Sequence, residues 1–315
     1  MVAAAQTTIA HIAQIYHQPF PDLLFLAQQI HRQHHDPRRV QMCTLSSIKT
    51  GACPEDCGYC SQSAHHDSNL QPKPLMQVED VFAQAQAAKA AGSTRFCMGA
   101  AWREVRDGAQ FDRVLDMVRQ IASLDLEVCC TLGMLKPHQA QQLKEAGLTA
   151  YNHNLDTSPS YYSQIITTRT YQDRLDTIRA VSDAGISVCC GGILGLGETI
   201  QDRLEMLQTL AQLSPPPESI PINCLIPIPG TPLQNAAPID SLELIRIVAT
   251  TRVLFPAAMV RLSAGRTEMS DELQAMCFFA GANSIFSGDV LLTAPNPGRS
   301  NDQRLLDRLG MMPMG

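Results

Sequence analysis

A repeated alternation of apolar runs and amphipathic stretches extends from about residue 40 to the end of the chain. Each unit begins with a short apolar, β-branched run and continues, after a loop, into a stretch whose apolar residues recur with the 3.6-residue period of a helix. The expected strands are Val40–Ile48, Thr94–Gly99, Leu126–Leu132, Leu148–Leu155, Ile186–Leu194, Ser219–Ile226, Met259–Ser263 and Asn283–Phe286. The expected helices are Val78–Ala91, Lys136–Ala146, Tyr171–Ala184, Thr199–Leu213, Asp240–Leu254 and Ser270–Ala280.

Eight such strand–helix units predict an α/β fold, a (β/α)8 barrel of the TIM type. The continuous apolar strands also fit a parallel sheet that is buried on both faces. A doubly wound open sheet is the alternative that this pattern leaves open. Residues 1–39 are predicted to form an N-terminal helical extension, and residues 40–315 the barrel with a C-terminal tail, which we expect at the surface after Pro295. The glycine-rich stretch 191–197 is not a dinucleotide fingerprint, because Ile200 stands where the third glycine is needed.

Composition and charge narrow the classes of function. The chain has 315 residues, of which 45% are hydrophobic and 17% charged, and its formal net charge is −6. This acidic balance argues against nucleic acid or an anionic membrane as a main partner, and no apolar run reaches the roughly 18 residues that a membrane span needs. Residues 1–20 lack the basic region of a signal peptide, so we expect a cytoplasmic protein. The eleven cysteines then need another explanation than disulfides.

The most specific motif is a group of three cysteines, Cys53, Cys57 and Cys60, with the spacing Cys-x3-Cys-x2-Cys. Soft thiolates select iron–sulfur clusters, zinc or Cu(I). A 4Fe–4S cluster that only carries electrons has four protein ligands, so three thiolates leave one iron open to a substrate or a cofactor. Zinc is the alternative, although structural zinc sites usually add a second cysteine pair or histidines at set spacing. Tyr59 could cover the open iron or stack on a nucleoside.

Soft and polar side chains also concentrate at the predicted carboxyl ends of the strands, where the active sites of (β/α)8 barrels lie. They are Cys97 on the second strand, Cys129 and Cys130 on the third, Asn152, Asn154 and Asp156 on the fourth, Cys189 and Cys190 on the fifth, Asn223 on the sixth and Arg261 on the seventh. Because successive side chains on a strand face opposite ways, only one cysteine of each adjacent pair can point into the barrel. Three inward cysteines on separate strands would suit a second soft-metal site, either zinc or another iron–sulfur centre.

The remaining polar residues are weighed by the same alternation. The two amides and the carboxylate on the fourth strand share one face, and because such a row needs partners when buried, we expect it to line an inward polar pocket. His153 lies on the opposite face and is expected to pack behind the pocket. Arg174 and Arg261 each fit either an anion clamp or an ordinary charge. Three further cysteines do not belong to such a group of inward residues at the strand ends and are assigned to the core: Cys43, Cys224 and Cys277.

At these residues the chain resembles the radical S-adenosylmethionine superfamily, whose signature is the three-cysteine motif with Tyr59. Four longer strings are similar to the biotin synthase family: SIKTGACPEDCGYCSQS at 47–63, YNHNLDT at 151–157, VRLSAGR at 260–266 and MCFFAGANSIF at 276–286. The resemblance extends over about residues 20–310. It implies a homodimer of complete barrels that inserts sulfur into dethiobiotin to form biotin. In that reaction an electron from a flavodoxin- or ferredoxin-type donor cleaves S-adenosylmethionine, and the resulting 5′-deoxyadenosyl radical abstracts hydrogen from the substrate.

The resemblance also implies a role for individual residues. Cys53, Cys57 and Cys60 would hold a 4Fe–4S cluster, whose open iron binds S-adenosylmethionine. The ligands of a 2Fe–2S cluster, which donates the sulfur, would be Cys97, Cys129, Cys189 and Arg261. Contacts to S-adenosylmethionine would come from Tyr59, from Asn154 and Asp156 at the ribose, from Arg174 at the methionine carboxylate, and from Ile193 and Ile226 at the adenine. Contacts to dethiobiotin would come from Asn152, Asn154 and Asn223 at the ureido group and from Thr293 at the carboxylate end.

The chain departs from the family pattern at three positions. Cys130 and Cys190 double two ligand positions where one cysteine is usual, and Ala294 stands where a second threonine is common. Two other interpretations remain open: a related radical enzyme, such as a methylornithine- or thiazole-forming relative, and a non-enzymatic iron–sulfur or zinc protein. The inward cysteines with Arg261 favour the sulfur-inserting family, because a relative that inserts no sulfur does not need them.

Overall fold

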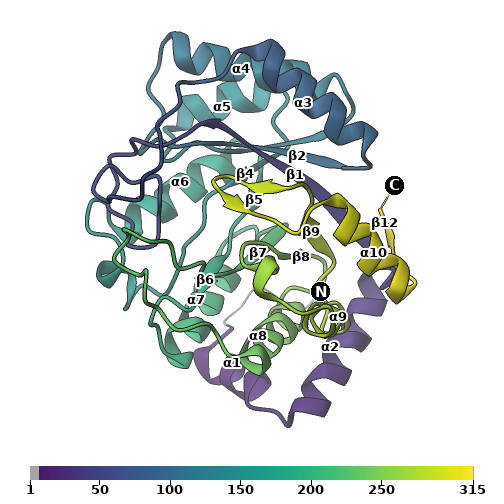
Figure 1. Cartoon of the computed structure of the whole chain (residues 1–315). Coiled ribbons are helices and arrows are strands. Elements are labelled where there is room, and N and C mark those ends of the chain that lie inside the picture. Colours follow the sequence, from purple (N-terminus) through teal and green to yellow (C-terminus); the bar gives the residue numbers. More distant parts are fainter. Residues whose placement is uncertain (1–6, 315) are drawn as a thin grey trace.

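The computed structural model describes residues 7–314, and its centre is a closed parallel β-sheet surrounded by helices (Figure 1). Neighbouring strands pair in chain order, and the last strand pairs with the first, so the sheet has no open edge. The barrel strands are β1 (Arg39–Lys49), β2 (Arg95–Ala100), β3 (Glu127–Thr131), β4 (Ala150–Asn152), β5 (Ser187–Cys189) continued by β6 (Gly192–Leu194), β7 (Ser219–Cys224), β8 (Met259–Leu262) and β9 (Ser284–Phe286). The (β/α)8 barrel is therefore confirmed, and the open-sheet alternative is wrong.

Helices cover the outside of the barrel. They are α3 (Val78–Ala90), α4 (Ala109–Ala122), α5 (Pro137–Glu145), α6 (Tyr171–Asp183), α7 (Ile200–Gln212), α8 (Ser241–Leu254) and α9 (Asp271–Phe279). The helix α4 is not among the helices predicted above, although its buried residues Phe111, Val114 and Val118 have helical spacing. The other six lie within the predicted ranges, to within a residue or two at each end.

The fourth and fifth strands are shorter than predicted. The expected strand Ile186–Leu194 divides into β5 and β6, because the backbone at Gly191 approaches β7 so closely that a Cβ there would lie 2.0 Å from the carbonyl oxygen of Pro221. Regular pairing of β4 ends at Asn152, and Asp156 adopts a φ of +66°, in the left-handed region. The chain therefore leaves both strands early and delivers its polar residues to the mouth of the barrel.

Two helices precede the barrel, α1 (Ile9–Tyr16) and α2 (Phe20–His34), and they pack against α7 and α8 (Figure 1). The guanidinium of Arg246 on α8 lies 5.5 Å from the ring centre of Tyr16 and 5.4 Å from that of Phe20. A cation held over two aromatic faces contributes to this contact together with the apolar surface that it covers.

The segment after Pro295 was predicted to lie at the surface, but part of it is buried in the fold. It forms α10 (Arg299–Leu309) and β12 (Met312–Pro313), and β12 extends the sheet beside β1. Leu305 and Leu306 are buried, and Asp302 forms an ion pair with the buried Arg266. The amphipathic face of α10 was not recognised in the sequence, although its apolar pair and its acidic residue lie three to four residues apart.

His31 on α2 should make the stability of the fold depend on pH. The imidazole is fully buried and its ring nitrogens have no hydrogen-bond partner, and burial together with Arg252 lowers its pKa to about 3. A histidine whose pKa is depressed in the folded state stabilises above the unfolded pKa of about 6.5, and stability falls by roughly 1.4 kcal/mol per pH unit below it. We expect urea unfolding at pH 7 and pH 5 to show this loss in the wild type and a smaller one in His31→Gln.

The exposed His34 on the same helix provides the control. His34→Gln should keep the wild-type dependence on pH. His35 has its pKa lowered to about 4 by burial and by Arg252, so it adds to the loss in both variants. Equal slopes in the wild type and in His31→Gln would contradict the assignment.

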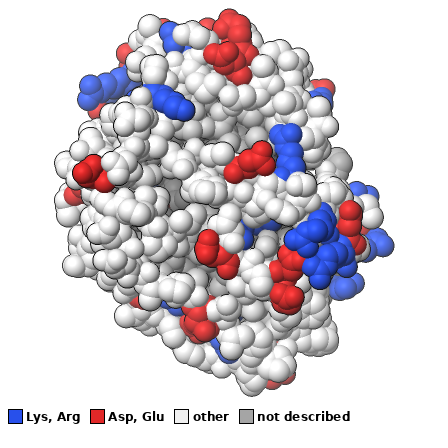
Figure 2. Space-filling view, viewed as in Figure 1, with Lys and Arg blue, Asp and Glu red and all other residues white. Residues whose placement is uncertain are grey.

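The surface carries charges of both signs. Figure 2 shows them interspersed over one face, with the largest mixed group on the side where Figure 1 places α10. There Arg304 and Arg308 both pair with Asp271 of α9. Within residues 7–314, no helix combines the length and the apolar composition that a bilayer crossing would need.

Candidate active site at the mouth of the barrel

A cavity of about 330 Å³ opens at the carboxyl ends of the strands. Every side chain to which a role was assigned from the sequence lines this cavity. The loops of a barrel converge at this end whatever their separation in the chain, which explains how residues 53 to 293 meet there. The cavity is therefore the candidate active site, and the structure brings the whole predicted set together.

The three-cysteine motif lies in the loop after β1, and backbone hydrogen bonds fold this loop back on itself. The amide of Cys53 donates to the carbonyl of Gln62 at 2.9 Å, and its own carbonyl accepts from the amide of Ala64 at 2.7 Å. Burial raises the pKa of Cys57 to about 12 and that of Cys60 to about 11. These thiols therefore keep their protons until a soft metal displaces them, and metal binding would release protons.

A second group of thiols lies deeper in the barrel. Cys97 and Cys129 are register partners on β2 and β3, and the thiol of Cys129 lies within hydrogen-bonding reach of both Cys97 and Cys189. Arg261 of β8 points Nη1 at the Sγ atom of Cys189, at 3.7 Å. The hydrogen bond with Cys129 and burial raise the pKa of Cys189, and Arg261 opposes this shift. Three thiols and a guanidinium from four strands thus line the same part of the interior.

The neighbours of these cysteines obey strand alternation. Cys130 and Cys190 pack in the large apolar core between the strands and the helices. Cys43, which was assigned to that core, instead packs with Cys97 and Cys129 on the inner side of the sheet. The register in which Cys129 and Cys189 face inward is the one that the structure has.

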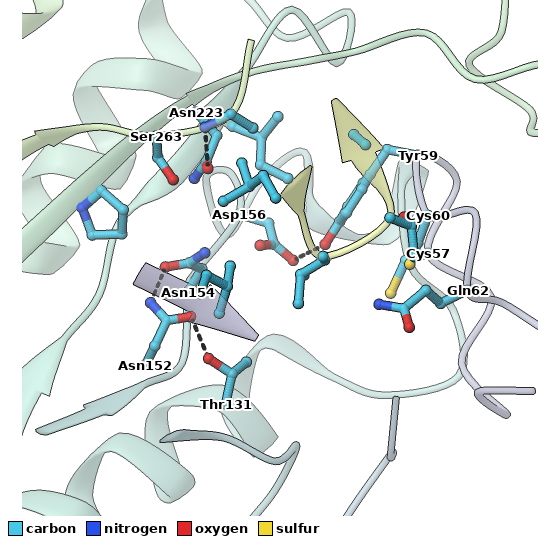
Figure 3. A pocket seen from close by; sticks show the side chains of 18 of the residues that line it. Cys57, Tyr59, Cys60, Gln62, Thr131, Asn152, Asn154, Asp156, Asn223 and Ser263 are labelled. Atoms are coloured by element: carbon cyan, nitrogen blue, oxygen red, sulfur yellow. Dashed lines mark hydrogen bonds between the residues drawn. The ribbon is translucent and has the colours of Figure 1, made fainter. Parts of the chain in front are cut away.

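The polar row of the fourth strand points into the cavity, as Figure 3 shows. Thr131 Oγ1 donates to Asn152 Oδ1 at 3.2 Å, and Asn152 Nδ2 donates to Asn154 Oδ1 at 3.0 Å. Beside them, the hydroxyl of Tyr59 donates to Asp156 Oδ2 at 2.9 Å. These bonds fix the direction of both amides and tie the carboxylate to the cysteine loop.

Arg174 of α6 uses its donors within the protein. Its Nε donates to the hydroxyl of Tyr162 at 2.8 Å, its Nη1 donates to the carbonyl of Asn154 at 2.6 Å, and its Nη2 is paired with Asp156. Burial by itself lowers the pKa of Arg174. The carboxylate of Asp156, together with other nearby groups, outweighs this effect, so the pKa of Arg174 lies above its ordinary value. These bonds use three of the five N–H donors of the guanidinium, and Arg174 lines the cavity.

Asn223 and Thr293 approach the cavity from its other side. Asn223 Nδ2 donates to the carbonyl of Gly192 at 2.9 Å, and its Oδ1 accepts from the amide of Ala264 at 3.2 Å. Thr293 lies between β10 (Val290–Leu291) and β11 (Ala294–Pro295), a hairpin across the mouth of the barrel, drawn in yellow in Figure 1. Its hydroxyl is 3.0 Å from that of Ser61 in the cysteine loop, so this contact joins the hairpin to the loop.

Several cavity residues were not predicted from the sequence. Thr131 and Ser263 line the cavity, and each lies two residues beyond a predicted ligand, so strand alternation already places them on the inner face. Glu55 and Arg169 also line it, and their nearest N–O distance is 3.8 Å. Glu55 lies inside the cysteine motif, a signal that was available, whereas nothing in the local sequence singles out Arg169.

The donor sets fit iron–sulfur groups by their chemistry. Both sets contain three soft thiols, and two buried donors of this region have no hydrogen-bond partner: Nε of Arg169, which lines the cavity and lies 3.8 Å from a carboxylate oxygen of Glu55, and Nη1 of Arg95, which is on the same strand as Cys97. Sulfide or thiolate acceptors would satisfy these donors, which are costly to leave unpaired. Among residues 7–314, no three histidine, cysteine, aspartate or glutamate side chains close around a single metal ion.

Two family models match the chain. One is described as the Radical SAM superfamily and matches residues 47–210, and the other, described as the Biotin and Thiamin Synthesis associated domain, matches residues 221–312. Together they cover the chain from the end of β1 to the start of β12, except for residues 211–220.

Curated proteins resemble the chain over nearly its whole length. A biotin synthase of Gloeobacter violaceus is 68% identical over 311 residues, which cover 99% of this chain and 98% of that protein. A biotin synthase of Christiangramia forsetii is 59% identical, with 97% of this chain and 84% of that protein covered.

Solved structures share the fold at low identity. Methylornithine synthase superposes with a TM-score of 0.81 at 17% identity, over 98% of this chain and 95% of that chain. The FeFe-hydrogenase maturase of Carboxydothermus hydrogenoformans superposes with a TM-score of 0.82 at 16% identity, over 98% of this chain and 76% of that chain. These two likenesses concern the fold alone.

Proposed function

The chain belongs to the biotin synthase family of radical S-adenosylmethionine enzymes, and on this premise we propose a role for each group in the cavity. The reaction is the insertion of sulfur into dethiobiotin to give biotin. The observation that supports this function best is that one cavity holds the three-cysteine loop, a second group of thiols with Arg261, and the amide row of β4.

The cysteine loop and the polar row beside it are the site for S-adenosylmethionine. Cys53, Cys57 and Cys60 hold a 4Fe–4S cluster, which when bound supplies the electron that cleaves the cofactor. Tyr59 and Asp156, joined by their hydrogen bond, face the cofactor ribose together with Asn154. Apolar side chains of Ile193 and Ile226 cover the adenine. Arg174, which lines the cavity and has N–H donors beyond those used within the protein, binds the methionine carboxylate.

The inner thiols are the site of the sulfur source. Cys97, Cys129, Cys189 and Arg261 hold a 2Fe–2S cluster, whose sulfide supplies the sulfur of biotin. These ligands lie on the strands, whereas the three-cysteine motif lies in the loop after β1, so the two clusters would occupy separate parts of the cavity. A buried site of this kind also excludes water, which protects a reactive radical.

Dethiobiotin lies between these two sites. The amides of Asn152, Asn154 and Asn223 both donate and accept hydrogen bonds, which matches the ureido group. Asn152 and Asn154 already bond to each other, so their orientations are set before the substrate arrives. Thr293 contacts the carboxylate end, and backbone amides of the hairpin replace the hydroxyl that Ala294 lacks.

The test is an anaerobic assay of reconstituted protein with dethiobiotin, S-adenosylmethionine and a low-potential reductant. We expect two spectroscopically distinct clusters, and biotin and 5′-deoxyadenosine as products. Protein that carries both clusters but forms no biotin would overturn the proposed function.

Asp156→Asn should weaken the binding of S-adenosylmethionine. The substitution removes the charge that accepts from Tyr59 and pairs with Arg174. Loss of a hydrogen bond to a charged group corresponds to about a 10- to 100-fold higher Kd. Equilibrium dialysis of the cluster-loaded protein measures this change.

Asp202→Asn is the matched control. Asp202 is a buried aspartate that caps α7 and bonds to Ser158 and Thr199, and it does not line the cavity. This variant should bind the cofactor with the wild-type Kd. An unchanged Kd in Asp156→Asn would remove Asp156 from the cofactor site.

Assembly, electron supply and location complete the proposal. We propose a cytoplasmic homodimer that takes its electrons from a flavodoxin- or ferredoxin-type protein. The proposed division of the chain is a helical extension over residues 1–39 and a catalytic barrel over residues 40–315, of which residues 1–6 and 315 lie outside the described residues. Sedimentation velocity tests the dimer, and reduction by each purified carrier tests the donor.

A further inference from the structure

Cys43 lies in the interior of the barrel, between the levels of the proposed 2Fe–2S ligands. Arg261 on β8 pairs with Ser284 on β9, and Ser284 pairs in turn with Gln41 on β1, two residues before Cys43. From Cys97 it passes to Leu45, two residues after Cys43. Residues two apart on a strand share a face and lie about 7 Å apart along it. The thiol of Cys43 therefore points inward, one step above the Arg261 level and one step below the level of Cys97 and Cys129.

The packing agrees with the register. Cys43 is completely buried and belongs to the same side-chain cluster as Cys97 and Cys129. The other cysteines without an assigned role belong to the large core cluster instead, and of these only Cys224 also lines the cavity: Cys130, Cys190, Cys224 and Cys277. Among the cysteines to which no role was assigned, Cys43 is thus set apart as the one that shares a cluster with proposed 2Fe–2S ligands.

A short hydrogen-bonded chain joins Cys43 to Arg261. The Oγ atom of Ser284 accepts from Arg261 Nε at 2.9 Å and donates to Gln41 Oε1 at 2.9 Å. Cys43 Sγ lies 3.8 Å from the same Oγ, and because the serine proton is committed to Gln41, the thiol is the donor. Cys43 and Arg261 are therefore linked through one shared side chain, the hydroxyl of Ser284.

We propose that Cys43 is a reserve iron ligand of the inner site, which takes the coordination position of Arg261 when the guanidinium leaves. This inference rests on the proposed function, because it presumes that the inner thiols hold a 2Fe–2S cluster. It identifies a fifth residue of that site, and it predicts that the cluster survives the loss of Arg261.

The chemistry favours such an exchange. A guanidinium has no free acceptor lone pair, so Arg261 can bind iron only as the deprotonated form, which is rare for this side chain. Thiolate is the softer and better ligand for iron. The exchange would replace one iron–nitrogen bond with one iron–sulfur bond, and the proton that Cys43 releases would be taken up by Arg261. Charge is conserved, and no electron is transferred.

The experiment measures how firmly the inner cluster is held, without reference to activity. Wild type, Arg261→Ala and Arg261→Ala/Cys43→Ser are reconstituted anaerobically, and the rate of iron release from the inner cluster to a chelator is followed by its visible absorbance. We expect Arg261→Ala to lose this iron at close to the wild-type rate. The double variant should lose it at least about tenfold faster, the size of effect that residues around a metal site commonly have.

Arg261→Ala/Cys277→Ser is the matched control, because Cys277 is an equally buried cysteine in the outer core. It should release iron as Arg261→Ala does. Equal rates in all the arginine variants, or loss of the inner cluster in Arg261→Ala alone, would overturn the inference while leaving the proposed function intact. Failure of the wild type itself to load an inner cluster would instead overturn the proposed function. Cys43→Ser keeps the size of the side chain, and circular dichroism verifies that each variant is folded.

Discussion

Cys57→Ala should abolish the cleavage of S-adenosylmethionine. Cys57 is the most buried thiol of the loop after β1, and it lines the same cavity as Tyr59 and Asp156. With one of three thiolates removed, the loop offers two ligands to a cluster that already lacks a fourth. We expect the iron and sulfide of the 4Fe–4S cluster to be lost, and the formation of 5′-deoxyadenosine and of biotin to fall to background.

The inner cluster should survive in this variant, since its ligands come from β2, β3, β5 and β8 rather than from the loop. Iron and sulfide analysis, together with the absorbance of the inner cluster, distinguishes this outcome from general misfolding. Cys277→Ala serves as the control, because it removes a buried thiol from the outer core and should keep both clusters. Cys57→Ala protein that still forms 5′-deoxyadenosine would remove the loop from the proposed chemistry.

Cys189→Ala should separate the two halves of the reaction. Cys189 touches Asn152 and Arg261 in the interior: Asn152 Nδ2 lies 3.4 Å from its Sγ atom and Arg261 Nη1 3.7 Å. Its loss removes a ligand of the inner cluster but leaves the cysteine loop complete. We expect 5′-deoxyadenosine to form still. Replacing a residue that only supports a metal ligand typically lowers activity by roughly 10- to 100-fold. Because Cys189 is proposed as a ligand itself, biotin formation should fall by more than this.

Cys190→Ala is the natural control for this prediction, because Cys190 is the adjacent residue on the outer face of the sheet. It should retain the inner cluster and the formation of biotin, with at most a loss of stability from the small cavity that it creates. If Cys190→Ala destroyed the inner cluster and Cys189→Ala did not, the register of this strand would be off by one residue, and every inward assignment on it would be wrong.

Much of the site could be predicted before the fold was known. The spacing of Cys53, Cys57 and Cys60 is local, and a chelating loop carries its signal within eight residues. The inner set was also predictable, because strand alternation chooses between the two members of each cysteine pair once the strands are recognised. Both predictions depend only on short-range geometry, which the order of residues specifies directly.

The predictions that depended on longer-range packing were less complete. The helix α4 was missed and the tail after Pro295 was placed at the surface, although α10 buries Leu305 and Leu306 and pairs Asp302 with Arg266. An amphipathic segment does not by itself reveal which neighbour will cover its apolar face, so its burial depends on elements far away in the chain.

The division between sequence and structure is clearest in the cysteines. By itself the sequence determined the barrel, the open-iron motif and the family, because periodicity, ligand spacing and long matching strings are all properties of chain order. Only the tertiary structure decided that Cys43 lies on the inner face and is linked to Arg261 through Ser284. It also decided that Arg174 binds Asp156, Asn154 and Tyr162 within the protein. The reason is that the register and stagger of a closed sheet determine which residues of different strands lie at the same height along the barrel axis. The sequence of a single strand contains no information about this height.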